Sequence, residues 1–252
     1  EGRLNMDEYR AAVDDDTAIV SLMWANNETG VIFPVEEAAA LARAKGALFH
    51  SDAVQAVGKI PIDMASSAVD MLSISGHKLH APKGIGALYL RRGLRYRPLL
   101  RGGHQERGRR AGTENVAGIV GLGEAARLAR EHMAEEWTTV KALRDRLEVG
   151  VLCSVPYAFV TGDAENRLPN TANIAFEYIE GEAILLLLNK QGIAASSGSA
   201  CTSGSLEPSH VMRAMDIPYT AAHGTVRFSL SRYTTEAEID RVIVAVPPII
   251  AQ

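Results

Sequence analysis

Apolar runs of strand length alternate with helical patterns through the first 110 residues, and this alternation constrains the fold more than any other feature. Residues 19–23 and 47–50 are strand-length runs, and the segment between them, 35–44, has the apolar spacing of a helix. Two further runs, 70–75 and 85–90, are separated by a turn rich in glycine and proline. This βαβ order of elements predicts an α/β fold with a mixed, mostly parallel sheet covered by helices.

The pattern changes after residue 113, where a long helical stretch leads into a second set of short runs. It is helical over 113–147, apolar at 159–160 and 172–176, helical over 182–190, and apolar again at 193–195 and 226–230. Thr235 and Glu238 have the spacing of a capping box, which predicts the start of a last helix. We therefore expect two domains, residues 1–133 and a smaller α+β domain at 134–252.

Composition narrows the class of protein. The formal net charge is −4, and we expect no local basic patch of the kind that would bind nucleic acid or an anionic membrane. No apolar run reaches the ~18 residues of a membrane span, and no signal peptide is evident.

Two cysteines suggest no disulfide framework and favour a reducing cytoplasm. Cys153 has the neighbours of a buried structural cysteine. The chain begins Glu1-Gly2-Arg3, and we expect it to be N-terminally incomplete.

Three polar segments follow strand-like runs, where open α/β sheets bind ligands. Residues 75–78 (Ser-Gly-His-Lys) place Lys78 there, although a lysine can equally be solvent-exposed. Residues 51–55 add Asp52, which could form a simple ion pair with a lysine or face the ring nitrogen of pyridoxal phosphate, for which lysine forms the Schiff base. Residues 26–30 (Asn-Asn-Glu-Thr-Gly) could be an ordinary turn.

Cys201 lies in surroundings unlike those of a structural cysteine. Residues 196–205 are small and polar throughout, with no apolar anchor. A thiol in such a segment is expected to be exposed and mobile, and suited to act as a nucleophile that reaches both a buried site and a partner's surface.

With these segments together, the chain resembles the pyridoxal phosphate-dependent cysteine desulfurases. The resemblance runs from about residue 17 to the C-terminus, and residues 101–106 and 180–182 most resemble the nitrogen-fixation branch. It implies a fold-type I aminotransferase-like architecture, with 1–133 as the later part of the large cofactor-binding domain and 134–252 as the small domain that carries the Cys201 loop. The segments that carry it are 26–30, 51–55, 75–78, 82–89, 109–115, 196–203 and 227–230.

The resemblance also implies the roles of individual residues. Lys78 and Cys201 are the expected catalytic residues, and Asn27 and Arg227 are expected to bind the substrate carboxylate. An arginine fork suits a carboxylate independently of the resemblance, although Arg227 could also form a structural ion pair. The residues implied to hold pyridoxal 5'-phosphate are Asn27, Asp52 (ring nitrogen), Gln55 (phenolic oxygen), Ser75, Gly76 and His77 (phosphate), Lys78, and Thr113 from the neighbouring subunit.

The implied reaction converts L-cysteine to L-alanine and leaves a persulfide on Cys201. The sulfur would pass to an iron–sulfur scaffold protein, with nitrogenase maturation as the expected destination, and Cys201 would touch metal only transiently, through that scaffold's cluster. The resemblance implies a homodimer. Charge and the length of the apolar runs lead us to expect no nucleic-acid and no membrane partner. Because the family's upstream phosphate loop and ring-stacking histidine are absent, we expect the fragment alone to bind cofactor weakly and to turn over poorly.

Other interpretations stay open. The chain could be a lyase of the selenocysteine type, although such an enzyme has no need of the Cys201 loop, or a non-catalytic protein that keeps the fold. A zinc module built on His77, His80 and Cys201 is a weaker alternative because no second ligand pair is close in sequence. Gly84 and Gly86 lack the third glycine of a nucleotide loop.

Overall fold

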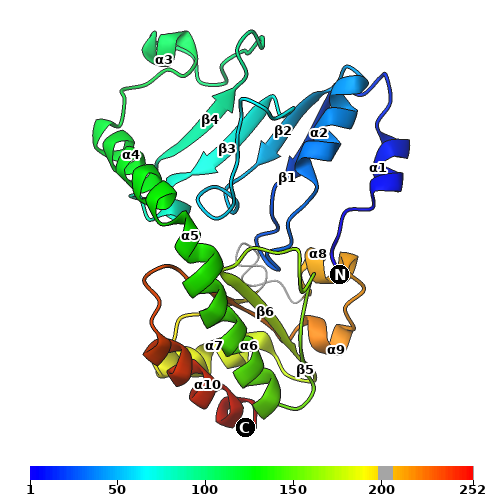
Figure 1. Cartoon of the computed structure of the whole chain (residues 1–252), viewed down its shortest axis with the longest axis vertical. Coiled ribbons are helices and arrows are strands. Elements are labelled where there is room, and N and C mark those ends of the chain that lie inside the picture. The colour runs from blue at the N-terminus through cyan, green and yellow to red at the C-terminus, as the bar shows by residue number, and fades with distance from the viewer. Residues whose placement is uncertain (198–206, 252) are drawn as a thin grey trace. The chain divides into compact units, whose positions relative to one another are not determined.

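The structure is a computed structural model that describes residues 1–197 and 207–251. The chain divides into two compact units (Figure 1). Unit 1 contains Glu1–Leu4, Ala25–Phe33 and His132–Gln252, and unit 2 contains Asn5–Trp24 and Pro34–Glu131. The domain limits expected from the sequence remain a prediction.

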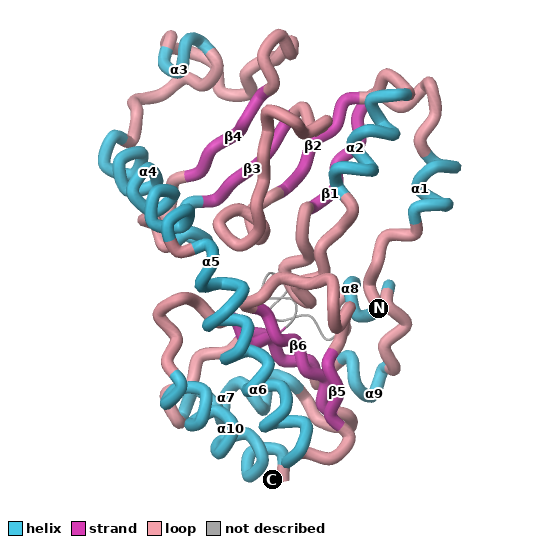
Figure 2. Tube along the Cα trace, in the orientation of Figure 1, coloured by secondary structure: helices cyan, strands magenta, loops and turns pink. Residues whose placement is uncertain are grey.

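Unit 2 is built on a four-stranded sheet in the order β1-β2-β3-β4, with bounds Ile19–Met23, Leu48–Asp52, Met71–Ser75 and Gly86–Leu90. β1, β2 and β3 pair in parallel, and β4 pairs antiparallel to β3. The predicted mixed, mostly parallel sheet is therefore confirmed for this unit. Its helices are α1 (Met6–Ala12), α2 (Val35–Ala44), the 3-10 helix η1 (Gly76–Leu79), α3 (Gln105–Gly108) and α4 (Val116–Glu131), as Figure 2 shows.

One face of this sheet is buried and the other is open. α2 buries Val35 and three alanines, and the inward residues of β2, Phe49 and Ser51, are fully buried. The alternation of a strand sends Leu48, His50 and Asp52 to the other face. That face exposes large apolar side chains, Ile19, Leu48 and Leu88.

Unit 1 is built on an antiparallel sheet in the order β5-β6-β8-β7. The strands are β5 (Ala158–Val160), β6 (Thr171–Phe176), β7 (Ser196–Ser197) and β8 (Thr225–Ser229). All six residues of β6 are buried, and the core continues into α6, α7 and α10. The helices are α5 (Met133–Glu135), the π-helix η2 (Glu136–Val140), α6 (Lys141–Ser154), α7 (Gly181–Lys190), α8 (His210–Ala214), α9 (Tyr219–Ala222) and α10 (Glu236–Ile250).

Two local expectations have opposite outcomes. The capping box is confirmed: Thr235 Oγ1 accepts the N–H of Glu238, and the Glu238 carboxylate accepts the N–H of Thr235, at the start of α10. The expectation of a buried Cys153 is wrong, because this residue is exposed on α6. α6 buries Leu143, Leu147 and Val151 along one stripe with a spacing of four residues, and Cys153 lies off that stripe.

Within residues 1–197 and 207–251, none of the helices has both the length and the apolar character needed to cross a membrane.

Candidate active site

Lys78 lies in η1, directly after the carboxyl end of β3. The chain enters this helix through Gly76, whose N–H donates to the Ile85 carbonyl oxygen at 2.9 Å. A Cβ on Gly76 would lie 2.7 Å from the Ile85 side chain, so only glycine fits this close approach. The next residue, Leu79, is buried in an apolar cluster that includes residues of α4. The backbone of Lys78 is therefore fixed on both sides.

Ser75 and His77 flank Gly76 and bond to each other. The Ser75 hydroxyl and His77 Nδ1 are 2.8 Å apart, and His77 is exposed while Ser75 is half-buried. Together they present a hydroxyl three residues before Lys78 and an imidazole one residue before it, at the carboxyl end of β3. Both groups can donate to an anion such as a phosphate.

Asp52 is the last residue of β2, one strand away from the Lys78 segment. Its Oδ1 accepts the N–H of Val54 at 2.9 Å, which fixes the carboxyl group and leaves Oδ2 as an acceptor at the exposed edge. Register pairs Asp52 with Ser73 of β3. Gln55 is half-buried in the turn that follows.

His50 supports this edge and was missed by the sequence analysis. Its ring bridges the Ser21 hydroxyl at Nδ1 and the Ser73 hydroxyl at Nε2, each at 2.8 Å, so that one imidazole joins β1, β2 and β3. His50 lies two residues before Asp52 and therefore on the same face of β2. The sequence signal for this role is a histidine two residues before a carboxylate in one strand, with a serine in the strand before and in the strand after. This signal can be recognised only when the register of the three strands is known.

On unit 1, the segment 26–30 is both a turn and part of the candidate site. Asn26 Oδ1 accepts the N–H groups of Glu28 and Thr29 at 2.8 and 3.0 Å, which is the turn chemistry expected of asparagine. Gly30 closes the turn with a φ of +79°. The Asn27 carbonyl oxygen then accepts a hydrogen bond from Arg227 Nη1 at 2.5 Å. The two residues expected to bind the substrate carboxylate are in contact.

Arg227 lies in the middle of β8, opposite a buried asparagine that the sequence analysis did not single out. Register pairs Arg227 with Asn173 of β6 and with Ser196 of β7. The Asn173 side chain donates to the Glu28 carbonyl oxygen at 3.2 Å, and its own Oδ1 accepts the Thr161 hydroxyl at 2.7 Å. Asn173 is fully buried, and a buried polar side chain needs hydrogen-bond partners. The sequence signal for such a residue was one asparagine inside an apolar run.

Glu28 is a buried carboxyl group in this cluster. The Ser209 hydroxyl donates to Glu28 Oε2 at 2.6 Å, and the same hydroxyl accepts the Val211 N–H as the N-cap of α8. Burial raises the pKa of Glu28, opposed by the Ser209 hydrogen bond and by the nearby charges of His210 and Arg227. This carboxyl group thus joins the turn that carries Asn27 to the start of α8.

Cys201 lies outside the described residues, so its expected role as the nucleophile stays a prediction. Among the residues that are described, the last before it belong to β7 and pair with Val226 and Arg227 of β8. Ser209 follows soon after it. In the same described part of the chain, no group of three or more His, Cys, Asp or Glu side chains could hold a metal ion.

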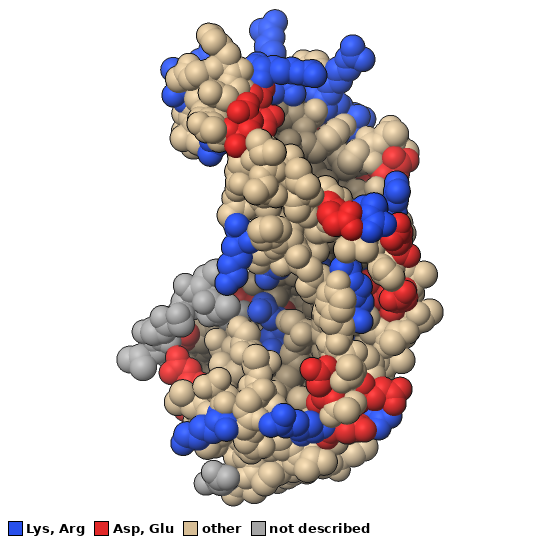
Figure 3. All heavy atoms as spheres, turned by 90° about the vertical axis from the view of Figure 1, so that its left-hand side faces the viewer, with Lys and Arg blue, Asp and Glu red and all other residues tan. Residues whose placement is uncertain are grey.

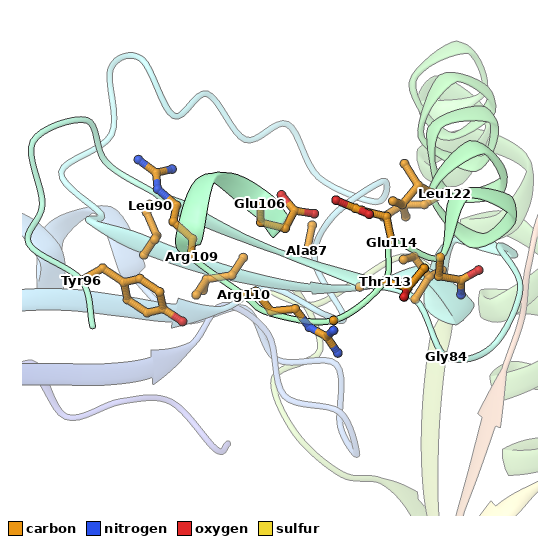
Figure 4. Close-up of a pocket in the computed structure, with 16 residues that line it drawn as sticks. Gly84, Ala87, Leu90, Tyr96, Glu106, Arg109, Arg110, Thr113, Glu114 and Leu122 are labelled. Atoms are coloured by element: carbon orange, nitrogen blue, oxygen red, sulfur yellow. The ribbon is translucent and has the colours of Figure 1, made fainter. Parts of the chain in front are cut away.

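Thr113 is exposed and lines a pocket of about 550 Å³ in unit 2 (Figure 4). The pocket lies against β4 and the start of α4, and its walls include Arg109, Arg110, Glu106 and Glu114. Figure 4 shows the carboxyl groups of Glu106 and Glu114 turned toward one another. Its lining does not include Ser75, His77 or Lys78. The expected contact of Thr113 with the cofactor phosphate of a neighbouring subunit therefore stays a prediction.

The groups on unit 2 fit pyridoxal phosphate by the chemistry of their donors. Asp52 supplies a fixed carboxylate for a pyridinium N–H, and Ser75 and His77 supply donors for a phosphate. Lys78 supplies the amine that such a cofactor requires.

Comparison with known proteins agrees with this donor set. Residues 1–242 match the family model for aminotransferase class-V, so the chain belongs to that family, which uses pyridoxal phosphate. A solved structure called a NifS-like protein superposes with a TM-score of 0.91 at 39% identity, over 99% of this chain and 66% of its own. The predicted fold-type I aminotransferase-like α/β fold is thereby confirmed.

Curated relatives are similar over the whole chain. Cysteine desulfurase NifS of Azotobacter vinelandii is 75% identical over 252 residues, and a cysteine desulfurase of Gluconacetobacter diazotrophicus is 72% identical over 251. Both alignments cover 100% of this chain and 63% of the relative. The chain thus spans less than two thirds of the length of these relatives.

Proposed function

We propose that this chain belongs to a pyridoxal phosphate-dependent cysteine desulfurase, which converts L-cysteine to L-alanine and leaves the sulfur on Cys201 as a persulfide. The observation that carries the proposal is the donor set at the carboxyl ends of β2 and β3: Asp52, Ser75, His77 and Lys78. The curated relatives of the same name support the choice of reaction within the family.

The lysine site holds the cofactor in this proposal. Lys78 binds it through the amine, and Asp52 keeps the ring nitrogen protonated. The bound cofactor supplies an electron sink for the pair released at the substrate α-carbon. In this proposal the Lys78 amine also moves the α-proton of the substrate. The remaining contacts are assigned to Gln55 at the phenolic oxygen, to Ser75, Gly76 and His77 at the phosphate, and to Asn27 beside the ring.

The substrate is held from unit 1. Arg227 presents a planar fork that matches a carboxylate, and its bond to the Asn27 carbonyl oxygen fixes the guanidinium. The Cys201 thiolate attacks the substrate sulfur, so that an S–S bond forms as the C–S bond breaks. The substrate carbon gains a proton and becomes the methyl group of alanine. Atoms and electrons balance without an external oxidant. The two sulfur atoms together lose two electrons when the S–S bond forms, and the substrate carbon gains the same two electrons.

A homodimer is part of the proposal. The outer side of α4, immediately after Thr113, exposes Val116, Ile119 and Val120 at 66%, 44% and 66%. Exposed apolar residues clustered in this way favour an interface. A second copy that covers this face of α4 would let Thr113 reach the cofactor phosphate of its neighbour.

The destination of the sulfur is also a proposal. We assign it to an iron–sulfur scaffold protein in a reducing cytoplasm, with nitrogenase maturation as the process served. The similarity to a protein named NifS supports this branch.

The test uses purified chain with added pyridoxal phosphate. Wild type is expected to show the absorbance of the attached cofactor and to release alanine from L-cysteine, both at a low level because the fragment is expected to bind cofactor weakly and to turn over poorly. Lys78→Ala should lose both, whereas Lys83→Ala, an exposed lysine five residues on, should keep both. Cys201→Ala should keep the absorbance and lose alanine formation from L-cysteine. Alanine formation that survives Cys201→Ala would favour a lyase of the selenocysteine type instead.

A further inference from the structure

Unit 1 has charges of both signs on its surface and an uncharged polar side chain, Asn173, in its interior. Figure 3 shows Lys, Arg, Asp and Glu side chains close together on this unit, and Lys and Arg side chains gathered over the loop after β4 in unit 2. Residues 91–110 hold eight arginines and one acidic residue, so the expectation of no local basic patch is wrong for that segment. Exposed charges are solvated and hold little of the interior in place. A buried amide can do so.

Asn173 lies within β6, between β5 and β8, and its exposed fraction is 0%. The Thr161 hydroxyl donates to Asn173 Oδ1 at 2.7 Å, and the Thr161 N–H donates to the Asn173 carbonyl oxygen at 2.9 Å. Asn173 Nδ2 donates to the Glu28 carbonyl oxygen at 3.2 Å. Because a carbonyl oxygen only accepts hydrogen bonds, the amide nitrogen must face Glu28, and Oδ1 must face Thr161. The orientation of the amide is therefore fixed on both sides.

Arg227 of β8 is the register partner of Asn173, so the two side chains lie on the same face of the sheet. Arg227 Nη1 donates to the Asn27 carbonyl oxygen, and the Asn173 amide donates to the next carbonyl oxygen along the chain, that of Glu28. Two cross-strand neighbours thus hold two successive carbonyl groups of one turn. The position of the turn relative to the Arg227 guanidinium depends on both.

The end of this turn is held in a different way from its tip. The Leu168 N–H donates to the Gly30 carbonyl oxygen at 2.8 Å, so a backbone bond fixes the end. The carbonyl groups of the tip, at Asn27 and Glu28, bond to side chains of β8 and β6, while the Glu28 carboxyl has its own partner at the start of α8. Loss of the β6 amide would therefore loosen the tip and leave the end of the turn in place.

We propose that Asn173 is a positioning residue for the substrate carboxylate. It holds the tip of the Asn27 turn, and thereby keeps the Arg227 guanidinium in the geometry that carboxylate binding requires. The inference rests on the proposed function, in which Asn27 and Arg227 bind that carboxylate. An arginine fork binds a carboxylate through two parallel hydrogen bonds, and this geometry tolerates little misplacement. Asn173 acts through Arg227 and does not touch the substrate.

The test compares Asn173→Ala with Asn170→Ala in the purified chain. Asn170 is also a buried asparagine, and its side chain donates at 3.2 Å to the Leu230 carbonyl oxygen, which is outside the Asn27 turn. Each variant loses one buried amide that donates to a backbone carbonyl, so the two should cost similar stability. Thr161→Val is a milder variant, because it keeps the Asn173 amide and removes only the hydroxyl that orients it. It decides the question if Asn173→Ala does not fold.

The first readout is hydrogen exchange of the Arg227 Nε–H, followed by NMR of the chain labelled with ¹⁵N-arginine and free of cofactor. Arg227 Nε is buried, so its proton is expected to exchange slowly while the guanidinium is held in place. Loss of the signal in Arg227→Lys assigns it. Asn173→Ala should speed this exchange by roughly tenfold or more, Thr161→Val by a smaller factor, and Asn170→Ala by less than about twofold.

The second readout is the KM for L-cysteine in alanine formation with added pyridoxal phosphate. Asn173→Ala should raise KM by roughly tenfold and change kcat by less than about twofold, because the carboxylate is bound alike before and during the reaction. Asn170→Ala should leave KM close to that of wild type.

Three outcomes would overturn the proposal. They are equal acceleration of Arg227 exchange in Asn173→Ala and Asn170→Ala, unchanged exchange in both Asn173→Ala and Thr161→Val, and a fall in kcat at unchanged KM in Asn173→Ala. Failure of the proposed function gives a different result, since wild type would bind cofactor and form no alanine. The exchange of Arg227 needs neither cofactor nor turnover, so it supports or overturns the role of Asn173 in that case as well.

Discussion

Replacement of Ser209 with alanine tests the link between the Asn27 turn and the start of α8. The Ser209 hydroxyl makes two bonds: it caps α8 and it donates to the buried Glu28 carboxyl at 2.6 Å. Loss of an N-cap costs about 1 kcal/mol. Loss of the donor to a buried acceptor costs about 1–3 kcal/mol more. We therefore expect Ser209→Ala to lower the free energy of unfolding by roughly 2–4 kcal/mol.

Thr235→Ala is the matched control. Thr235 is also an N-cap hydroxyl, but its partners at the start of α10 are exposed. This variant should lose only the cap, about 1 kcal/mol. Urea unfolding followed by circular dichroism at neutral pH measures both. Equal destabilisation of the two variants would refute the view that Glu28 depends on Ser209.

The pH dependence gives the same prediction a second readout. Burial raises the pKa of Glu28 above its ordinary value of 4.5. The folded state therefore holds the proton more tightly than the unfolded state, and stability falls as pH rises from 4.5 through the folded pKa. The Ser209 bond opposes this shift, so Ser209→Ala should steepen that fall. A destabilisation that is independent of pH across this window would contradict the account.

Three further predictions concern folding. Glu148→Ala should lower the free energy of unfolding by about 3–5 kcal/mol in chemical denaturation. It leaves the Arg167 guanidinium, which is only 5% exposed, without its bidentate carboxylate partner. Gly224→Ala should cost roughly 3 kcal/mol or more in the same assay, since its Cβ would overlap the carbonyl oxygen at the end of β6. The hydrogen bond and charge of Arg3 lower the pKa of Asp163, so the stabilisation is present at neutral pH and is lost on acidification. The difference in stability between wild type and Arg3→Ala should shrink as pH falls below about 4, and a constant difference would contradict it.

Much of unit 2 was predictable because its strands are continuous apolar runs with turn residues between them. The predicted runs at 19–23 and 70–75 overlap β1 and β3 almost residue for residue. The run at 47–50 continues two residues further, to Asp52, because pairing with both neighbours holds those residues in the sheet. Local pattern carries no information about such pairing.

The contacts of the candidate site were less accessible. Arg227 and Asn27 are separated by 200 residues, and their bond depends on the placement of β8 beside the Asn27 turn. β7 is two residues long and exists only through its pairing with β8. The site residues were named from a resemblance in their motifs. Asn173 was signalled only by its place in an apolar run, and Ser209 became visible only through its partners.

The central claim is that sulfur moves from L-cysteine to Cys201 in a step that requires Lys78. Mass spectrometry of peptides from the chain, incubated with pyridoxal phosphate and L-cysteine, tests this directly, and the exposed Cys153 serves as an internal control. We expect one additional sulfur atom on Cys201 in wild type and in Lys83→Ala, none on Cys153, and none on either residue in Lys78→Ala. Extra sulfur on Cys153 alone, or on Cys201 with Lys78 removed, would contradict the proposed function.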